Sequence, residues 1–194
     1  KIGHMNVDKI TDAFKNANIR ITGKGYYKAG MGDGGACHPR DNIALSWLAE
    51  KLGLGYDLFN AISHAREEQT RNMAKFIADI CHKQGKPCVI NGKAYKPAVP
   101  YVIGSPSVLL AGYLAELNVE VKFADSETSD LLDGEQDCVC VMAHDPQTTY
   151  SHTGKVYKQK LYFDLKKGST VIDPWRCFAD ERFKVIHYGD TRVK

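Results

Sequence analysis

Cys88-Val-Ile-Asn91 is a short, mostly apolar run that begins directly after Gln84-Gly85-Lys86-Pro87, and the two together decide the fold. The glycine and proline end a helix, and a buried strand typically follows such signals as a short apolar run. Ser105-Pro106 then forms an N-cap and first-turn pair that opens a helix to residue 117. Further strands are predicted at residues 119–123, 137–143, 169–173 and 184–187. Strands that alternate with helices in this way predict an α/β domain with a mostly parallel sheet and helices on both faces.

The chain before this run is predicted to be helical. Apolar residues recur at three- and four-residue steps in residues 1–20, 42–52 and 57–83, and the last of these ranges is long and amphipathic. We therefore predict two domains, a helical region at residues 1–84 and an α/β domain at residues 85–194.

Composition excludes several classes of function. With 194 residues and 43% hydrophobic content, the chain can bury one good core or two small ones. A net charge of +3 does not imply a nucleic-acid or membrane partner, and no apolar run approaches the ~20 residues that span a bilayer. The six cysteines are scattered without a disulfide or zinc spacing, so we expect no metal and a reducing, cytoplasmic environment.

The glycine-rich stretch Gly32-Asp-Gly-Gly-Ala-Cys37-His-Pro-Arg-Asp41 is the candidate reactive site. Asp41 is the predicted N-cap of the helix at residues 42–52. The unpaired N–H groups and the positive end of the dipole at a helix start would stabilise a thiolate at Cys37. The alternative is that the glycines only form a turn and that the cysteine is buried and inert.

This stretch, together with Gly92-Lys-Ala-Tyr95-Lys96-Pro97 and Ile172-Asp-Pro-Trp-Arg176, resembles the ordered motifs of the UDP-glucose/GDP-mannose dehydrogenase family. The resemblance implies a nucleotide-sugar 6-dehydrogenase, which uses NAD to oxidise a UDP-sugar or GDP-sugar alcohol to a uronate in two hydride transfers. It also implies that residues 85–194 form a Rossmann-like, UDP-binding domain and that the central helices build a homodimer. Because no Gly-x-Gly-x-x-Gly motif follows a strand upstream of these motifs, the chain resembles the C-terminal part of a longer enzyme.

In the family, the residue at the position of Cys37 adds to the sugar aldehyde, and the resulting thiohemiacetal is oxidised to a thioester that water hydrolyses. Asp41 would hold or activate that water, in addition to capping the helix. The resemblance further implies that Arg40 contacts NAD, although Arg40 would equally suit an ion pair with Asp33. His38 and residues 98–103 depart from the family pattern, which bears on the cofactor contacts and the substrate subfamily.

Lys96 and Arg176 follow predicted strands and are the candidate diphosphate ligands, because arginine offers a planar fork for phosphate oxygens. The alternative is that both are ordinary surface cations. Tyr95 would stack on the base or sugar, or else pack in the core. The remaining candidates for substrate binding lie in the linker and the glycine loop, where a surface loop is the alternative: Arg20, Tyr26, Tyr27, Gly34 and Gly35.

Two other functions compete with this interpretation. The chain would act as a non-catalytic nucleotide-binding or dimerisation module if the NAD-binding half is lacking. A cysteine hydrolase with a Cys-His pair is the third hypothesis. His38 is a poor partner for Cys37 in that mechanism, because from a helix start its side chain points elsewhere.

Overall fold

The computed structural model describes residues 6–16, 29–32, 37–144 and 161–191. The helices are α1 (Val7–Asn16), α2 (Cys37–Lys51), α3 (Leu58–Gln84) and α4 (Pro106–Glu116). The strands are β1 (Cys88–Asn91), β2 (Val121–Ala124), β3 (Glu135–Gln136), β4 (Val139–Met142), β5 (Asp164–Leu165), β6 (Thr170–Ile172) and β7 (Lys184–Ile186).

Five of these strands form a parallel sheet in the order β2-β1-β4-β6-β7, as predicted for an α/β fold. Cys88 of β1 lies beside Val121 of β2 on one side and Val139 of β4 on the other. The chain moves outward in one direction from β1 to β2 and in the other direction through β4, β6 and β7. The switch point of the topology therefore lies between β1 and β4, where ligands bind outside the carboxyl ends of the strands in such sheets.

The two faces of the sheet are covered differently. Cys88 and Ile90 point into a core shared with α3 and α4, whereas Val89 points to the opposite face. That second face packs against residues that include Cys138, Phe163 and Leu165. Helices were predicted on both faces, and in the described part of the chain α3 and α4 both cover the first face. The physical reason is that short strands and loop side chains close the second face there.

The helix boundaries follow local capping chemistry. Asp57 caps α3 by accepting a hydrogen bond from Asn60 N at 2.9 Å, and Gly85 ends it with a left-handed φ of 62°. Ser105 caps α4, with Pro106 at its first turn. These boundaries confirm the sequence prediction. The prediction that Asp41 is an N-cap is wrong, because α2 begins four residues earlier, at Cys37, and continues through Asp41.

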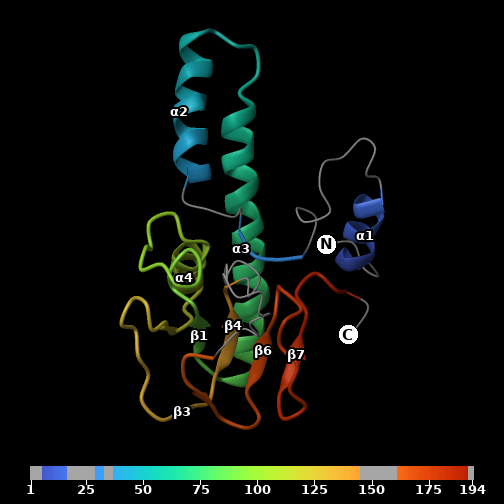
Figure 1. Cartoon of the computed structure of the whole chain (residues 1–194), viewed down its shortest axis with the longest axis vertical. Coiled ribbons are helices and arrows are strands. Elements are labelled where there is room, and N and C mark those ends of the chain that lie inside the picture. Colours follow the sequence, from blue (N-terminus) through green and yellow to red (C-terminus); the bar gives the residue numbers. More distant parts are fainter. Residues whose placement is uncertain (1–5, 17–28, 33–36, 145–160, 192–194) are drawn as a thin grey trace.

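In Figure 1, α2 and the first half of α3 stand side by side above the sheet, while the second half of α3 runs along it. The buried residues of α3 lie in that second half, from Thr70 to Cys81. One continuous helix thus joins the helical hairpin to the core of the sheet. Among the described residues, no helix is both long and apolar enough to cross a membrane.

Candidate active site

The candidate site is built at the carboxyl edge of the sheet, where the loops that follow β1, β2, β4, β6 and β7 meet. The buried polar residues of these loops come directly after their strands, because a parallel sheet brings all of its strand ends to one edge. These residues are Asp125 after β2, His144 after β4 and Asp173 after β6.

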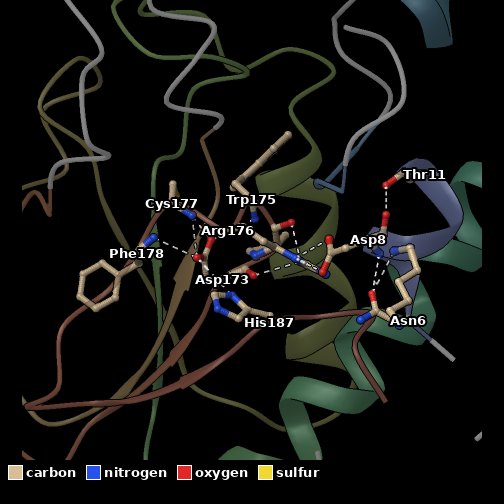
Figure 2. Close-up of polar contacts among 11 residues, drawn as sticks. Asn6, Asp8, Thr11, Asp173, Trp175, Arg176, Cys177, Phe178 and His187 are labelled. Carbon is tan, nitrogen blue, oxygen red and sulfur yellow. Dashed lines mark hydrogen bonds and ion pairs between the residues drawn. The ribbon is translucent and has the colours of Figure 1, made fainter. Parts of the chain in front are cut away.

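Asp173 organises the loop after β6, which carries the motif arginine (Figure 2). Its carboxylate is fully buried and accepts backbone hydrogen bonds from Trp175 N at 3.0 Å, Cys177 N at 2.8 Å and Phe178 N at 2.9 Å. His187 Nδ1 lies 3.5 Å from Asp173 Oδ2. A buried carboxylate with three N–H donors holds the loop in one shape, since each unmade bond would leave a desolvated polar group.

Arg176 leaves this loop in a left-handed conformation, with φ 59°. Its Nε lies 2.9 Å from Asp8 Oδ1, and its Nη1 donates to Pro174 O at 2.9 Å and Asp173 O at 3.4 Å. The remaining nitrogen, Nη2, is buried and has no partner among the described residues. Protein oxygens therefore hold the guanidinium of Arg176, the candidate phosphate ligand, and its Nη2 is the donor without a partner among the described residues.

Asp8 lies in the first turn of α1, which docks on the ends of β6 and β7. Asn6 caps this helix by accepting from Asp8 N at 2.8 Å, and Asn6 itself bridges Asp190. Val7 N also donates to Gly189 O at 3.4 Å. The amino end of α1 is thus attached to the segment that follows the last strand of the sheet, and this attachment brings Asp8 to Arg176.

The loop after β1 carries the second motif. Asp125, at the end of β2, accepts from Lys93 N and Ala94 N, each at 2.8 Å, and fixes the start of this loop. Lys96 Nζ lies 5.3 Å from the ring centroid of Tyr95, and Tyr95 packs edge-on against Tyr101 at 6.0 Å. Lys96 and Tyr95 are both half-buried. The structure therefore brings these two predicted ligands into contact with each other.

His144 lies at the switch point, where its ring packs on Gly92. A Cβ at Gly92 would lie 2.6 Å from His144 Cδ2, and Gly92 has a φ of +113°, so only glycine fits this position. His144 Nε2 is 2.8 Å from Ala94 O, and burial lowers the pKa of this histidine. The imidazole is therefore neutral, with its Nε2–H donated to the carbonyl.

Cys37 is exposed and is the first residue of α2. Arg40 Nε donates to Asp41 Oδ1 at 2.8 Å, and the Asp33 partner considered from the sequence lies outside the described residues. This hydrogen bond raises the pKa of Arg40 and lowers that of Asp41. Weaker electrostatic interactions with Cys37 and Tyr101 also raise the pKa of Arg40.

The other predicted ligands, Arg20, Tyr26, Tyr27, Gly34 and Gly35, lie outside the described residues. Sequence reasoning missed Asp8, Asp125, His144 and Asp173. His144 directly follows the predicted strand at residues 137–143, Asp125 comes two residues after the one at 119–123, and Asp173 is the last residue of the one at 169–173. These positions at strand ends were the available signal. No comparable signal marked Asp8, whose role depends on how α1 docks.

Two further observations bound the chemistry. Within residues 6–16, 29–32, 37–144 and 161–191, no group of three or more His, Cys, Asp and Glu side chains is placed to hold a metal ion. A surface hollow of about 340 Å³ is lined by residues that include Cys81, Pro87 and Glu120. It lies at the amino ends of β1 and β2, away from the carboxyl edge.

Known proteins have sequences similar to this one. Residues 2–68 match the sequence model described as "UDP-glucose/GDP-mannose dehydrogenase family, central domain". UDP-glucose 6-dehydrogenase TuaD of Bacillus subtilis is 31% identical over 121 residues, which are 62% of this chain and 26% of TuaD. UDP-glucose 6-dehydrogenase of Rickettsia conorii is 28% identical over 181 residues, which are 86% of this chain and 42% of that protein. The chain thus matches less than half the length of these relatives.

Solved structures share the fold. A UDP-D-ManNAc dehydrogenase from Pyrococcus horikoshii superimposes with a TM-score of 0.65 over 98% of this chain and 46% of that one, at 19% identity. A GDP-mannose dehydrogenase from Pseudomonas aeruginosa gives 0.56 over 91% of this chain and 45% of that one, at 14% identity. The chain is thus similar in sequence, over residues 2–68, to the central domain of the UDP-glucose/GDP-mannose dehydrogenase family, and it shares a Rossmann-like fold with these two solved structures.

Proposed function

We propose that this chain is the catalytic-loop and nucleotide-sugar-binding part of an NAD-dependent nucleotide-sugar 6-dehydrogenase. The observation that supports the proposal is the position of Cys37, an exposed thiol at the amino end of α2, five residues after Gly32. Gly32 packs on Pro106, the first residue of α4, directly after the loop that bears Tyr95 and Lys96.

In the proposed reaction, Cys37 Sγ adds to the carbonyl carbon of the sugar aldehyde and forms a thiohemiacetal. The thioester that follows is released by water, which Asp41 holds one turn further along α2. Its hydrogen bond with Arg40 lowers the pKa of Asp41, so this carboxylate is ionised and accepts a hydrogen bond from water. A nicotinamide cofactor, when bound, supplies the hydride acceptor for both oxidations.

The described residues fit this cofactor only in part. Arg40 is an exposed cation three residues after Cys37, which suits a cofactor phosphate. The loop after β1 does not provide a dinucleotide cradle, because the carboxylate of Asp125 already occupies the N–H groups of Lys93 and Ala94. The sheet is therefore assigned to the nucleotide sugar in this proposal.

Lys96 and Arg176 are the proposed diphosphate ligands, with Tyr95 beside the base or sugar. Lys96 has its ammonium group over the Tyr95 ring and is not paired with a carboxylate in the described part of the chain. Arg176 has one nitrogen without a partner there. We expect Lys96→Ala to weaken UDP binding about tenfold, as loss of one charged hydrogen bond would. The matched control is Lys167→Ala, on the exposed turn before β6.

Alkylation of Cys37 tests the nucleophile. Iodoacetamide should label Cys37 ahead of the half-buried Cys177, and UDP-glucose should slow labelling of Cys37 while leaving that of Cys177 unchanged. A parallel experiment with GDP-mannose shows whether a uridine or a guanosine nucleotide sugar protects Cys37. Peptide mass spectrometry follows each thiol separately. If neither nucleotide sugar protects Cys37, and calorimetry shows no UDP binding, the proposed function is wrong.

A homodimer is proposed through the helical hairpin. Large apolar side chains on α2, on the connection and on the start of α3 remain exposed, including Ile43, Trp47, Leu52, Leu54 and Leu58. Large apolar side chains left exposed on one helical hairpin are candidates for an association site. Sedimentation analysis should give a dimer that Leu52→Lys dissociates, with Leu131→Lys, at an exposed position outside the hairpin, as the control. A monomeric wild-type chain would exclude this interface.

A further inference from the structure

The segment that leads to Cys37 lies between two side chains of the sheet domain. A Cβ at Gly30 would be 2.3 Å from Trp175 Cζ3 and 2.8 Å from Cε3, so the indole rests on the Gly30 backbone where any side chain would stand. Gly32 meets Pro106 in the same way, with its Cβ position 2.3 Å from Pro106 Cγ, and has a left-handed φ of +77°. Met31, between them, is 7% exposed and belongs to the core.

Trp175 is itself fixed at the base of its loop. Its backbone N–H donates to Asp173 Oδ1 at 3.0 Å, and its ring joins the core that α3 and α4 share. Figure 2 shows Trp175 next to Arg176 in the loop held by Asp173. One short loop therefore carries both the candidate phosphate ligand and the ring that covers Gly30.

Chain length limits how far Cys37 lies from this contact. Five residue steps separate Gly32 from Cys37, and an extended chain of that length spans at most about 18 Å. On its other side, Cys37 is the first residue of α2, and α2 packs along α3. The position of Cys37 thus depends on the Gly30–Trp175 contact from one side and on α2 from the other.

We propose that Trp175 is a positioning residue for Cys37: its indole holds Gly30, Met31 and Gly32 on the carboxyl edge of the sheet and so sets the place of the thiol relative to the ligand bound there. This inference rests on the proposed function for the identity of that ligand, a nucleotide sugar. It assigns the Trp and Arg of one motif to two tasks, since Arg176 meets the phosphate and Trp175 places the nucleophile.

The test uses the full chain and Gly30→Ala, which inserts a methyl group into the indole. Gly55→Ala is the matched control, because a Cβ there meets nothing within 4 Å. We expect Gly30→Ala to keep its affinity for UDP and to lose about tenfold of the protection that UDP-glucose gives Cys37, since a small displacement suffices to misplace a reacting group. Unchanged protection in Gly30→Ala, with UDP bound, would overturn the inference.

A second readout needs no ligand. Trp47→Phe leaves Trp175 as the only tryptophan, since the chain has 2. In this background Gly30→Ala should shift the emission of Trp175 and change the rate of Cys37 alkylation, whereas Gly55→Ala should do neither. If Gly30→Ala changes neither, the inference fails even where UDP binds. Failure of UDP to bind the wild-type chain would instead contradict the proposed function and leave this readout intact.

Trp175→Leu covers the case in which Gly30→Ala does not fold, because it removes the ring without inserting atoms. The Cys37 alkylation rate should change in the same way. Adding Gly30→Ala to Trp175→Leu should then have little further effect, since both substitutions remove one contact. Fully additive effects of the two substitutions would show that they act separately and would overturn the inference.

Discussion

Arg176 Nε lies 2.9 Å from Asp8 Oδ1, and this ion pair joins α1 to the loop after β6 across most of the length of the chain. The Asp8 side chain is 40% exposed and that of Arg176 is 20% exposed, so solvent screens the pair in part. We expect Asp8→Asn to lower the free energy of unfolding by about 1 kcal/mol or less. The rate of amide hydrogen exchange in α1 should increase by more than the fall in the free energy of unfolding of the whole chain accounts for. Lys9→Ala is the control.

The same substitution tests how Arg176 is used. If diphosphate replaces Asp8 as the partner of the guanidinium, Asp8→Asn should strengthen UDP binding, because the competing carboxylate charge is gone. Titration calorimetry of both variants measures this directly. Weaker UDP binding in Asp8→Asn would show instead that Asp8 orients Arg176 for the ligand.

Asp173→Asn should be more damaging. The carboxylate accepts three backbone N–H bonds while fully buried, and an amide in its place would turn an NH₂ group towards some of these donors. We expect a loss of about 2–3 kcal/mol in the free energy of unfolding, measured by urea denaturation. Asp133→Asn, on an exposed loop, is the control and should change little. Equal stability of the two variants would mean that the loop does not depend on Asp173.

Gly92→Ala and Gly168→Ala separate backbone strain from crowding. Both glycines have positive φ, +113° and +92°, but only a Cβ at Gly92 would collide with another residue, His144. We expect Gly168→Ala to cost about 1–2 kcal/mol and Gly92→Ala at least about 3 kcal/mol in the free energy of unfolding. If the two substitutions cost the same, His144 does not pack on Gly92 as described.

His144 should make stability depend on pH. Burial lowers its pKa in the folded protein, so below the unfolded value, about 6.5, the unfolded chain binds a proton that the folded chain does not. The contribution of His144 to stability is therefore complete above that pH and is lost as pH falls towards the folded pKa, at up to about 1.4 kcal/mol per pH unit. As pH falls from 8 to 5, the melting temperature should decrease less steeply for His144→Gln than for the wild-type chain. His82→Gln, on the exposed face of α3, should keep the wild-type slope.

Local sequence signals predicted much of the fold. The apolar runs around Cys88 and Val139, the cap Ser105, and Gly85 all act within a few residues, and the structure confirms them. The predicted start of α2 was wrong. Proline is unfavourable inside a helix, but Pro39 lies within the first turn, where its missing N–H breaks no intrahelical hydrogen bond. Pro39 therefore permits the helix to begin before Asp41.

The site was less predictable than the fold. Cys37, Lys96 and Arg176 carry motifs and were named from the sequence, whereas the partner of Arg176 was not. Asp8 reaches Arg176 only because Asn6 and Val7 attach α1 to the segment after the last strand, and that docking depends on contacts between distant segments. Periodicity and caps report only on neighbours along the chain, so they could not identify this pair.

The continuous helix α3 has a consequence for the design of chimeras between relatives. Its residues from Thr70 to Cys81 form one wall of the sheet's core, together with Leu110 and Leu114 of α4. A crossover point placed at Gly85, where the sequence pattern changes, would transfer the sheet without the α3 residues that pack on it. A donor segment that begins near Ser63 would include those residues and would place the junction between the two parents in the part of α3 that lies outside the core of the sheet.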